Sequence, residues 1–399
     1  MLSARSKIGG MMSWDVIVLG AGAAGLMAGI EAARRGRRVL VLDHAKAPAE
    51  KIRISGGGRC NFTNLHIAPD RFLSQNPRFA RSALSRFTQH DFIARMDRAG
   101  IAWHEKTLGQ LFCDGSARQV VDMLVQDLIK AGGVLRLGVQ ISGVQAGYRV
   151  ETAEGPLNAQ SVIVATGGKS IPKMGATGFG YDIAEHFGLR LVATRAGLVP
   201  LSFTDAQLGW MKPLAGLAVP ARVGLAGEKI SFDEGLLFTH RGLSGPSILQ
   251  ISSYWREGQA VTVDLAPDRD LAIEATQARD SMGRKDLVNA LDLPEKLARS
   301  LIERAGLSGR LADQSRKSLA ALAAAAHRWS LVPAGTEGFR TAEVTLGGVD
   351  TRDLDAKSLQ ARGAPGLFFI GEVVDVTGWL GGYNFQWAWS SGWAAGQVA

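Results

Sequence analysis

The fold is decided by residues 14–25, which read WDVIVLGAGAAG. The first six of these residues predict a buried strand, and three glycines follow it directly. Gly20 allows a tight turn, Gly22 lets the backbone approach a pyrophosphate, and Gly25 lets a helix pack closely on the strand. The N-terminus of that helix offers free N–H groups and a partial positive charge to phosphate groups.

A second predicted strand, residues 38–42, follows the helix and ends on an acidic residue. This residue, Asp43, lies eighteen positions after Gly25. In a dinucleotide site, an acid at this place accepts hydrogen bonds from a ribose hydroxyl. The order strand, glycines, helix, strand and acid predicts a Rossmann-like α/β domain that binds a dinucleotide.

Features at both ends of the chain favour FAD as that dinucleotide. Residues 51–61 read KIRISGGGRCN, a glycine-rich loop in which Lys51 and Arg59 can offset phosphate charge. Residues 366–372 predict a strand that ends on Gly371 and Glu372, and a glycine-rich segment then leads into a C-terminal helix of small residues. A ligand that contacts both of these segments must be longer than a single mononucleotide. FAD is such a ligand.

Five segments carry a resemblance to a known family, and they span nearly the whole chain in order. They are KIRISGGGRCNFTN at 51–64, ATGG at 165–168, GATGFGY at 175–181, FTHRGLSGP at 238–246 and GEVVDVTGWLGGYN at 371–384, continuing to Gly392. The chain resembles the bacterial BaiN-like (YhiN-type) flavoproteins, within the glutathione-reductase-like two-domain FAD superfamily. The resemblance implies non-covalent FAD and an NAD(P)/FAD-dependent oxidoreductase, and it leaves the substrate open.

The glycine turn, the resemblance and the predicted strand ends together define an expected cofactor site. Glu372 and Asp375 are expected at the ribityl hydroxyls, and the loop at 381–384 at the pyrimidine edge of the flavin, where N–H groups stabilise negative charge. A loop salt bridge and a plain helix cap are the alternatives for these two features. The expected residues are Gly20, Gly22, Ala23, Ala24, Gly25, Asp43, His44, Lys51, Ser55, Gly56, Gly57, Gly58, Arg59, Cys60, Asn61, Val139, Ala165, Thr166, Gly167, Gly371, Glu372, Asp375, Gly381, Gly382, Tyr383 and Asn384.

The pattern changes near residue 198, where short strands alternate with Gly, Pro and Asp before a helical stretch at 270–326. We therefore expect a discontinuous FAD-binding domain, residues 1–195 and 341–399. Residues 196–340 are expected to form an inserted substrate or cap domain of strands followed by helices. His240 and Arg241, in a predicted turn of this insertion, are the candidate proton donor and anion clamp, and a purely structural turn is the alternative.

The reaction expected from these features is hydride transfer through flavin N5 to an unsaturated organic acceptor, a small and anionic molecule. NAD(P)H is the expected reductant, although no second strand–GxGxxG–helix pattern follows the first. Two alternatives stay open. One is a flavin monooxygenase or oxidase, and the other is a flavin-bound protein that interacts with tRNA or has a regulatory role.

Composition restricts the partners. The formal net charge is +8, but the basic residues are scattered and form no known RNA-binding module, so nucleic acid is the less favoured partner. No uninterrupted apolar stretch is long enough for a membrane span.

The two cysteines, Cys60 and Cys113, have no metal-ligand spacing, so we expect no metal and a cytoplasmic location. The N-terminus has no apolar region typical of a signal peptide, and Met1, Met11 or Met12 could be the true start.

Overall fold

A computed structural model describes residues 13–282 and 286–399, and these fall into two compact units. Unit 1 combines residues 1–195 with 344–399, and unit 2 is Ala196–Glu343. Unit 2 covers the region where the sequence predicts an insertion at 196–340. The alternative starts at Met1, Met11 and Met12 lie outside the described residues.

The main sheet of unit 1 is parallel at its centre. β1 lies between β2 and β10, β7 pairs with β2, and β20 pairs with β10, all in parallel, whereas β9 and β8 continue the sheet as antiparallel strands. These strands are β1 (Ser13–Leu19), β2 (Val39–Asp43), β7 (Val134–Leu137), β8 (Ile141–Gln145), β9 (Arg149–Thr152), β10 (Leu157–Val164) and β20 (Leu367–Phe369). The apolar runs of β1 and β2 are buried, as expected where helices cover both faces. The predicted Rossmann-like α/β class is confirmed.

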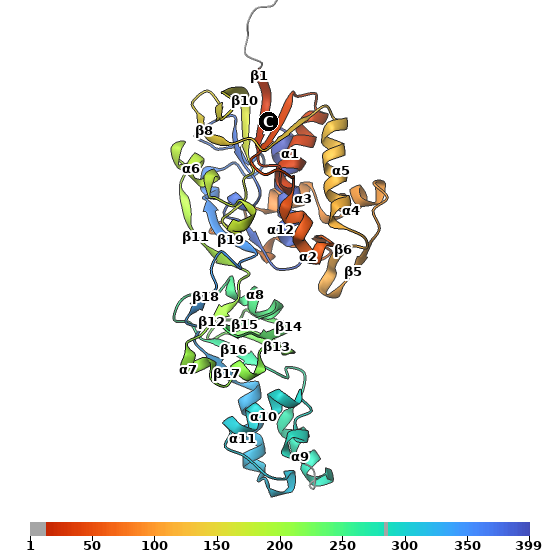
Figure 1. Ribbon diagram of the computed structural model, residues 1–399, viewed down its shortest axis with the longest axis vertical. Coiled ribbons are helices and arrows are strands. Elements are labelled where there is room, and N and C mark those ends of the chain that lie inside the picture. Colours follow the sequence, from red (N-terminus) through yellow and green to blue (C-terminus); the bar gives the residue numbers. More distant parts are fainter. Residues whose placement is uncertain (1–12, 283–285) are drawn as a thin grey trace, which may run out of the picture. The chain divides into compact units, whose positions relative to one another are not determined.

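The helices of unit 1 pack around this sheet, and α1 and α12 lie side by side (Figure 1). A Cβ atom at Gly392 of α12 would lie only 2.5 Å from the carbonyl oxygen of Ala24 in α1. This close approach explains the small residues of the C-terminal helix. The helices are α1 (Ala23–Arg34), α2 (Glu50–Gly58), α3 (Arg81–Arg86), α4 (Gln89–Arg98), α5 (Ala117–Lys130), α6 (Phe179–His186) and α12 (Tyr383–Gly396).

Small sheets join distant parts of unit 1. β6 pairs with both β3 and β5, and β4 pairs with β21, which brings residues 72–73 next to 377–378. These strands are β3 (Asn61–Asn64), β4 (Phe72–Leu73), β5 (Trp103–Glu105), β6 (Gln110–Cys113) and β21 (Thr377–Gly378), and β11 (Leu191–Gly197) and β19 (Val344–Val349) form a further ribbon.

The structure corrects the prediction of a loop over residues 51–61. The segment from Lys51 to Ile54 is helical and belongs to α2. The chain leaves helical dihedral angles at Ser55, and Gly56, Gly57 and Gly58 then have φ of 56°, 66° and 85°. The glycines thus end a helix and lead into β3.

Unit 2 is built on a seven-stranded sheet in the order β17-β16-β13-β14-β15-β12-β18. Its strands are β12 (Leu201–Ser202), β13 (Ala218–Leu225), β14 (Ser231–Phe238), β15 (Gly242–Ser244), β16 (Val261–Asp264), β17 (Trp329–Leu331) and β18 (Gly335–Thr336). Its helices are α7 (Asp205–Leu208), α8 (Pro246–Ser252), α9 (Leu271–Met282), α10 (Glu295–Arg304) and α11 (Arg316–His327). The expectation of strands followed by helices was incomplete, because β17 and β18 come after the helices and return to the sheet.

None of the helices in the two described ranges combines the length and apolar character that a membrane crossing requires.

Candidate active site

The glycine turn after β1 is shaped by two close contacts. Gly20 has φ of +108°, and a Cβ atom there would lie 2.4 Å from the carbonyl oxygen of Ala165. A Cβ atom at Gly25 would lie 1.9 Å from the carbonyl oxygen of Gly20. At Gly22, by contrast, a Cβ atom would meet no protein atom within 4 Å. Gly20 and Gly25 are therefore required by packing, and Gly22 marks the open side of the turn.

The N-terminus of α1 has the properties of an anion site. No side chain caps it, and its first turn, which includes Ala23 and Ala24, contains no acidic residue. Unpaired N–H groups at a helix N-terminus favour phosphate, and the open side at Gly22 lies at the same place. The turn thus fits the diphosphate of a dinucleotide.

Asp43 ties the end of β2 to the glycine turn. Its Oδ2 accepts a hydrogen bond from the N–H of Ala21 at 2.7 Å, and its Oδ1 accepts one from the N–H of Ala45 at 2.8 Å. Each carboxylate oxygen keeps a further lone pair for a ribose hydroxyl. Val139 donates its N–H to the carbonyl oxygen of Asp43 at 3.0 Å, and the exposed His44 ring lies beside the same carboxylate. These three predicted residues therefore gather at one edge of the sheet.

The segment after β10 meets the same edge. The N–H of Ala165 donates to the carbonyl oxygen of Leu19 at 2.8 Å. The hydroxyl of Thr166 is buried and has no hydrogen-bond partner among the described residues. Gly167 has φ of +74°, and a Cβ atom there would meet no protein atom within 4 Å. A buried hydroxyl without a partner, next to an open glycine, fits a polar ligand at this edge.

Lys51 and Glu372 form an ion pair that links α2 to the segment after β20. The Lys51 Nζ lies 2.5 Å from Glu372 Oε2, and Glu372 Oε1 accepts hydrogen bonds from Ser170 Oγ and the N–H of Thr345, both at 2.9 Å. Gly371, with φ of +69°, approaches Ala24 at the start of α1. Glu372 thus connects α2, in the first part of the chain, to the segment after β20. The positive charge of Lys51, which the sequence predicts beside a phosphate, is paired with the Glu372 carboxylate.

Asp375 is buried, and its side chain is held by the segment after β4. Its Oδ2 accepts hydrogen bonds from the N–H of Gln75 at 2.8 Å and from Ser74 Oγ at 3.4 Å. Burial raises the pKa of the Asp375 carboxyl above its ordinary value, and these hydrogen bonds oppose the shift.

The loop before α12 packs closely against β3 and β6. Gly381 and Gly382 have φ of 99° and 94°, and a Cβ atom at Gly382 would lie 2.3 Å from the carbonyl oxygen of Thr63. The Asn384 amide donates to the carbonyl oxygens of Gly378 and Trp379. The Tyr383 hydroxyl accepts a hydrogen bond from Arg71. Tyr383 and Asn384 therefore hold the loop in place.

The end of α2 contains the remaining predicted residues of unit 1. Gly56, Gly57 and Gly58 all have positive φ, Ser55 Oγ donates to a carbonyl oxygen of its own helix, Arg59 is exposed, and Asn61 begins β3. Cys60 is fully buried, and burial raises the pKa of its thiol far above the ordinary value. A buried thiol of this kind behaves as a small apolar side chain.

The predicted catalytic pair, His240 and Arg241, belongs to unit 2. Both residues are exposed in the turn between β14 and β15, where the N–H of Arg241 donates to Thr239 Oγ1 at 3.3 Å. His240 and Arg241 therefore belong to unit 2, whereas the predicted FAD residues belong to unit 1.

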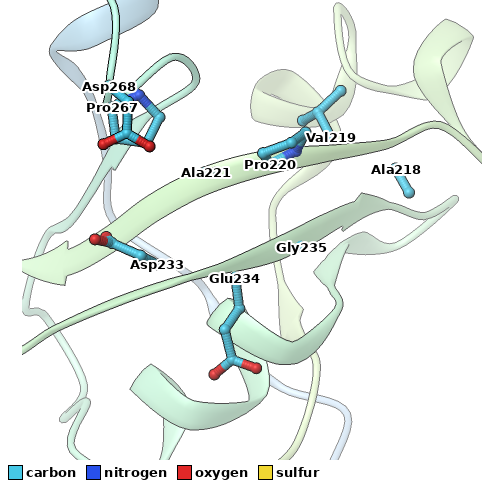
Figure 2. A pocket seen from close by; sticks show the side chains of 9 residues that line it. All are labelled: Ala218, Val219, Pro220, Ala221, Asp233, Glu234, Gly235, Pro267 and Asp268. Atoms are coloured by element: carbon cyan, nitrogen blue, oxygen red, sulfur yellow. The ribbon is translucent and has the colours of Figure 1, made fainter. Parts of the chain in front are cut away.

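Unit 2 also contains a hollow of about 410 Å³, which holds none of the predicted site residues (Figure 2). Two of its acidic side chains have partners: Asp233 pairs with Arg222, and Glu234, whose pKa is raised by burial, accepts a hydrogen bond from Gln250. Over the parts of the chain that the structure describes, no group of three or more His, Cys, Asp or Glu residues is placed to hold a metal ion. The lining residues are Ala218, Val219, Pro220, Ala221, Asp233, Glu234, Gly235, Pro267 and Asp268.

Comparison with known proteins decides the family. Residues 14–398 match the HI0933-like protein Rossmann domain. The chain belongs to this family. Over 395 residues it is 50% identical to the ribosomal RNA dihydrouridine synthase of Escherichia coli, covering 97% of this chain and 98% of that protein. The Haemophilus influenzae protein of the same name is 45% identical, covering 95% of this chain and 96% of that protein.

A more distant relative supports the BaiN-like resemblance. The 3-dehydro-bile acid delta(4,6)-reductase of Clostridium scindens is 28% identical, covering 96% of this chain and 98% of that protein. The resemblance expected from the sequence motifs is confirmed, and the HI0933-like chain is an FAD-dependent oxidoreductase.

Sequence reasoning missed the polar residues that connect the loops of this site. Asn64 is buried, and its amide nitrogen donates to the carbonyl oxygens of Gly381 and Leu108. Thr345 and Ser170 hold Glu372. Asn64 lies inside the quoted segment 51–64, but the partners that give it a role are distant in sequence.

Proposed function

We propose that this chain reduces the C5=C6 double bond of a uracil base in ribosomal RNA and so forms dihydrouridine. The observation that carries the proposal is the 50% identity, over almost the whole length of both chains, to a relative named ribosomal RNA dihydrouridine synthase. A second relative with the same name, at 45% identity, adds to this support.

The chemistry belongs to the hydride-transfer class expected from the sequence. The C5=C6 bond of uracil is conjugated with the C4 carbonyl, so C6 accepts a hydride and C5 takes a proton. FAD supplies the hydride when it is bound. NAD(P)H is the proposed donor, so one NAD(P)H and one proton are consumed for each uracil reduced. The name of the bile acid relative also describes a reductase.

The residues of unit 1 are proposed to hold FAD in a defined order. The N–H groups at the start of α1, beside Gly22, would bind the diphosphate, and Asp43 would accept a hydrogen bond from the ribose. The backbone of Gly381 and Gly382 would face the pyrimidine edge of the flavin. The hydroxyl of Thr166 would gain a partner from the ligand.

An RNA substrate departs from the sequence-based preference for a small anionic molecule. The names of the relatives and the formal net charge of +8 support a polyanion. Unit 2 is proposed as the substrate domain, with His240 and Arg241 as proton donor and phosphate clamp. The proposed location is the cytoplasm.

The test uses FAD-loaded protein, without oxygen, with ribosomal RNA transcribed in vitro and NADH or NADPH. We expect reductant to be consumed only in the presence of RNA, and dihydrouridine to appear when the RNA nucleosides are analysed by mass spectrometry. Reduction of small conjugated acceptors but of no RNA would overturn the proposal. Rapid peroxide formation in air, without RNA reduction, would favour an oxidase instead.

A further inference from the structure

The tip of the β5–β6 hairpin combines exposure with backbone strain. Leu108, between the two strands, is 56% exposed. Its φ is +59°, in the left-handed region that an L-residue with a branched side chain occupies only at a cost. Strain of this kind is typical of residues whose conformation serves binding.

The tip is fixed to the loop that we propose to face the flavin. The Asn64 amide nitrogen donates to the carbonyl oxygen of Leu108 at 3.1 Å and to that of Gly381 at 2.9 Å. Asn64 is 1% exposed, and its Oδ1 accepts a hydrogen bond from the N–H of His66. A Cβ atom at Gly109 would lie 2.9 Å from this Oδ1, so a glycine is needed beside Leu108. The exposed leucine is thus held rigidly next to the Gly381 loop.

Cationic side chains lie beside aromatic rings both on the hairpin and in the segment before Gly381. Lys106 is exposed, with its ammonium 5.4 Å from the ring centroid of Phe112. The Arg71 guanidinium lies 5.2 Å from the ring centroid of Trp379, and the backbone N–H of Trp379 donates to the Arg71 carbonyl oxygen. Trp379 lies two residues before Gly381. An apolar tip with an exposed lysine two residues away suits a base stack between phosphates better than a purely apolar partner.

We infer that Leu108 is a wedge that enters the RNA base stack beside the target uridine. This inference rests on the proposed function. In a helical stem the faces of a uracil are covered by its neighbours, so an enzyme must unstack the base before it can reach C5=C6. Apolar side chains inserted at a base step provide such unstacking. Because Asn64 already fixes the tip, insertion requires no ordering of the hairpin.

The key variant is Leu108→Gly, which removes the side chain and relieves the strain, since glycine adopts positive φ readily. Its melting temperature is expected to equal or exceed that of the unsubstituted protein. The probe is an RNA stem with one uridine next to 2-aminopurine, mixed with the oxidised FAD-loaded protein. We expect the unsubstituted protein to raise the 2-aminopurine fluorescence and L108G not to, at similar RNA affinity.

Turnover should separate stems from single strands. Reduction of the stem uridine by L108G is expected to fall by about tenfold or more, because unstacking is no longer assisted, and that of the same uridine in an unpaired strand to stay unchanged. Leu108→Phe, which restores an apolar wedge, should keep the stem activity. Ile129→Ala is the matched control, because Ile129 on α5 is 60% exposed.

Two results are decisive. If L108G unstacks and reduces the stem uridine like the unsubstituted protein, the wedge is wrong and the proposed function stands. If the unsubstituted protein reduces no uridine in any RNA, the proposed function fails, and the 2-aminopurine fluorescence alone then tests the wedge. An increase in fluorescence that is lost in L108G supports the wedge, and no increase with the unsubstituted protein refutes it.

Discussion

The three glycines of the turn after β1 have different neighbours, so their substitutions should have different effects. Gly25→Ala would place a methyl group 1.9 Å from the carbonyl oxygen of Gly20. We expect G25A to lose about 1–3 kcal/mol of unfolding free energy, because helix and strand must move apart. Chemical denaturation of the protein without FAD measures this loss. Unchanged stability would mean that the turn relaxes freely.

Gly22→Ala provides the matched comparison at the same turn. Its new methyl group meets no protein atom within 4 Å, and its φ of −79° suits any L-residue. We therefore expect G22A to unfold like the unsubstituted protein but to bind FAD poorly, because the methyl group occupies the path of the diphosphate. The ratio of flavin to protein absorbance reports the binding. FAD retained by G22A would argue against the diphosphate at this position.

Asp375 should make stability depend on pH in an unusual direction. Burial raises its pKa in the folded protein above the ordinary 3.8, so the carboxyl favours folding when protonated. This contribution is complete below the unfolded pKa and is lost as pH rises through the folded pKa. Asp375→Asn cannot ionise, so the variant does not lose this stability as pH rises, and its amide oxygen can still accept the hydrogen bond from the N–H of Gln75. The unfolding free energy of D375N, relative to the unsubstituted protein, should rise from acid to neutral pH, as urea titrations at several pH values will measure. A constant or falling difference would contradict this.

At the scale of elements, the first βαβ unit was predictable because its information is local. The strand, the glycines, the helix and Asp43 follow one another within residues 14–43. Each can be recognised from its own residues, without knowledge of distant contacts. The end of α2 was not predictable in the same way. Three consecutive glycines indicate a loop, yet Lys51 lies in a helix and pairs with Glu372, more than three hundred positions away. Tertiary contacts of this range leave no periodic signal in the sequence.

The same reasoning applies to the side chains of the site. The backbone role expected for Gly381 and Gly382 follows from their glycine identity. The bracing roles of Asn384 and Glu372 do not, because carboxylates and amides bind ligands and loops equally well. In unit 2, β17 is only three residues long. Such a short strand gives a weak sequence pattern, so its pairing with β16 after the helices was not predicted.

The ion pair between α2 and the segment after β20 can be tested at the element scale. Lys51→Met keeps the aliphatic stem and removes the charge, while Glu372 keeps its hydrogen bonds from Ser170 and Thr345. We expect K51M to lose about 1–2 kcal/mol of unfolding free energy, because a partly buried charge-assisted hydrogen bond is lost. Thermal and urea unfolding measure the loss. Arg53→Met, in the same helix, is the control, since Arg53 pairs with Glu50 locally. Equal losses in the two variants would contradict a specific bracing role.

Across the whole molecule, the charge is divided unevenly between the two units. The sequence of unit 1 contains 28 Lys and Arg against 20 Asp and Glu, and that of unit 2 contains 17 of each. The entire formal net charge of +8 therefore belongs to the unit with the glycine turn. A scattered set of arginines looked uninformative along the sequence, because the assignment of each one to a unit depends on the fold.

This division predicts that unit 1 makes most of the phosphate contacts with RNA, in addition to the single clamp proposed at Arg241 of unit 2. Each phosphate contact releases counterions, so replacing contacting cations weakens binding and flattens its dependence on salt. We expect Arg78→Gln with Arg81→Gln, exposed in unit 1, to lower the slope of log affinity against log salt by about 1 or more. Lys296→Gln with Lys317→Gln, exposed in unit 2, should leave the slope unchanged. Fluorescence anisotropy of a labelled RNA stem at several salt concentrations measures both. If the unit 2 pair lowered the slope as much as the unit 1 pair, net charge would not locate the RNA surface, and unit 2 would make as many phosphate contacts as unit 1.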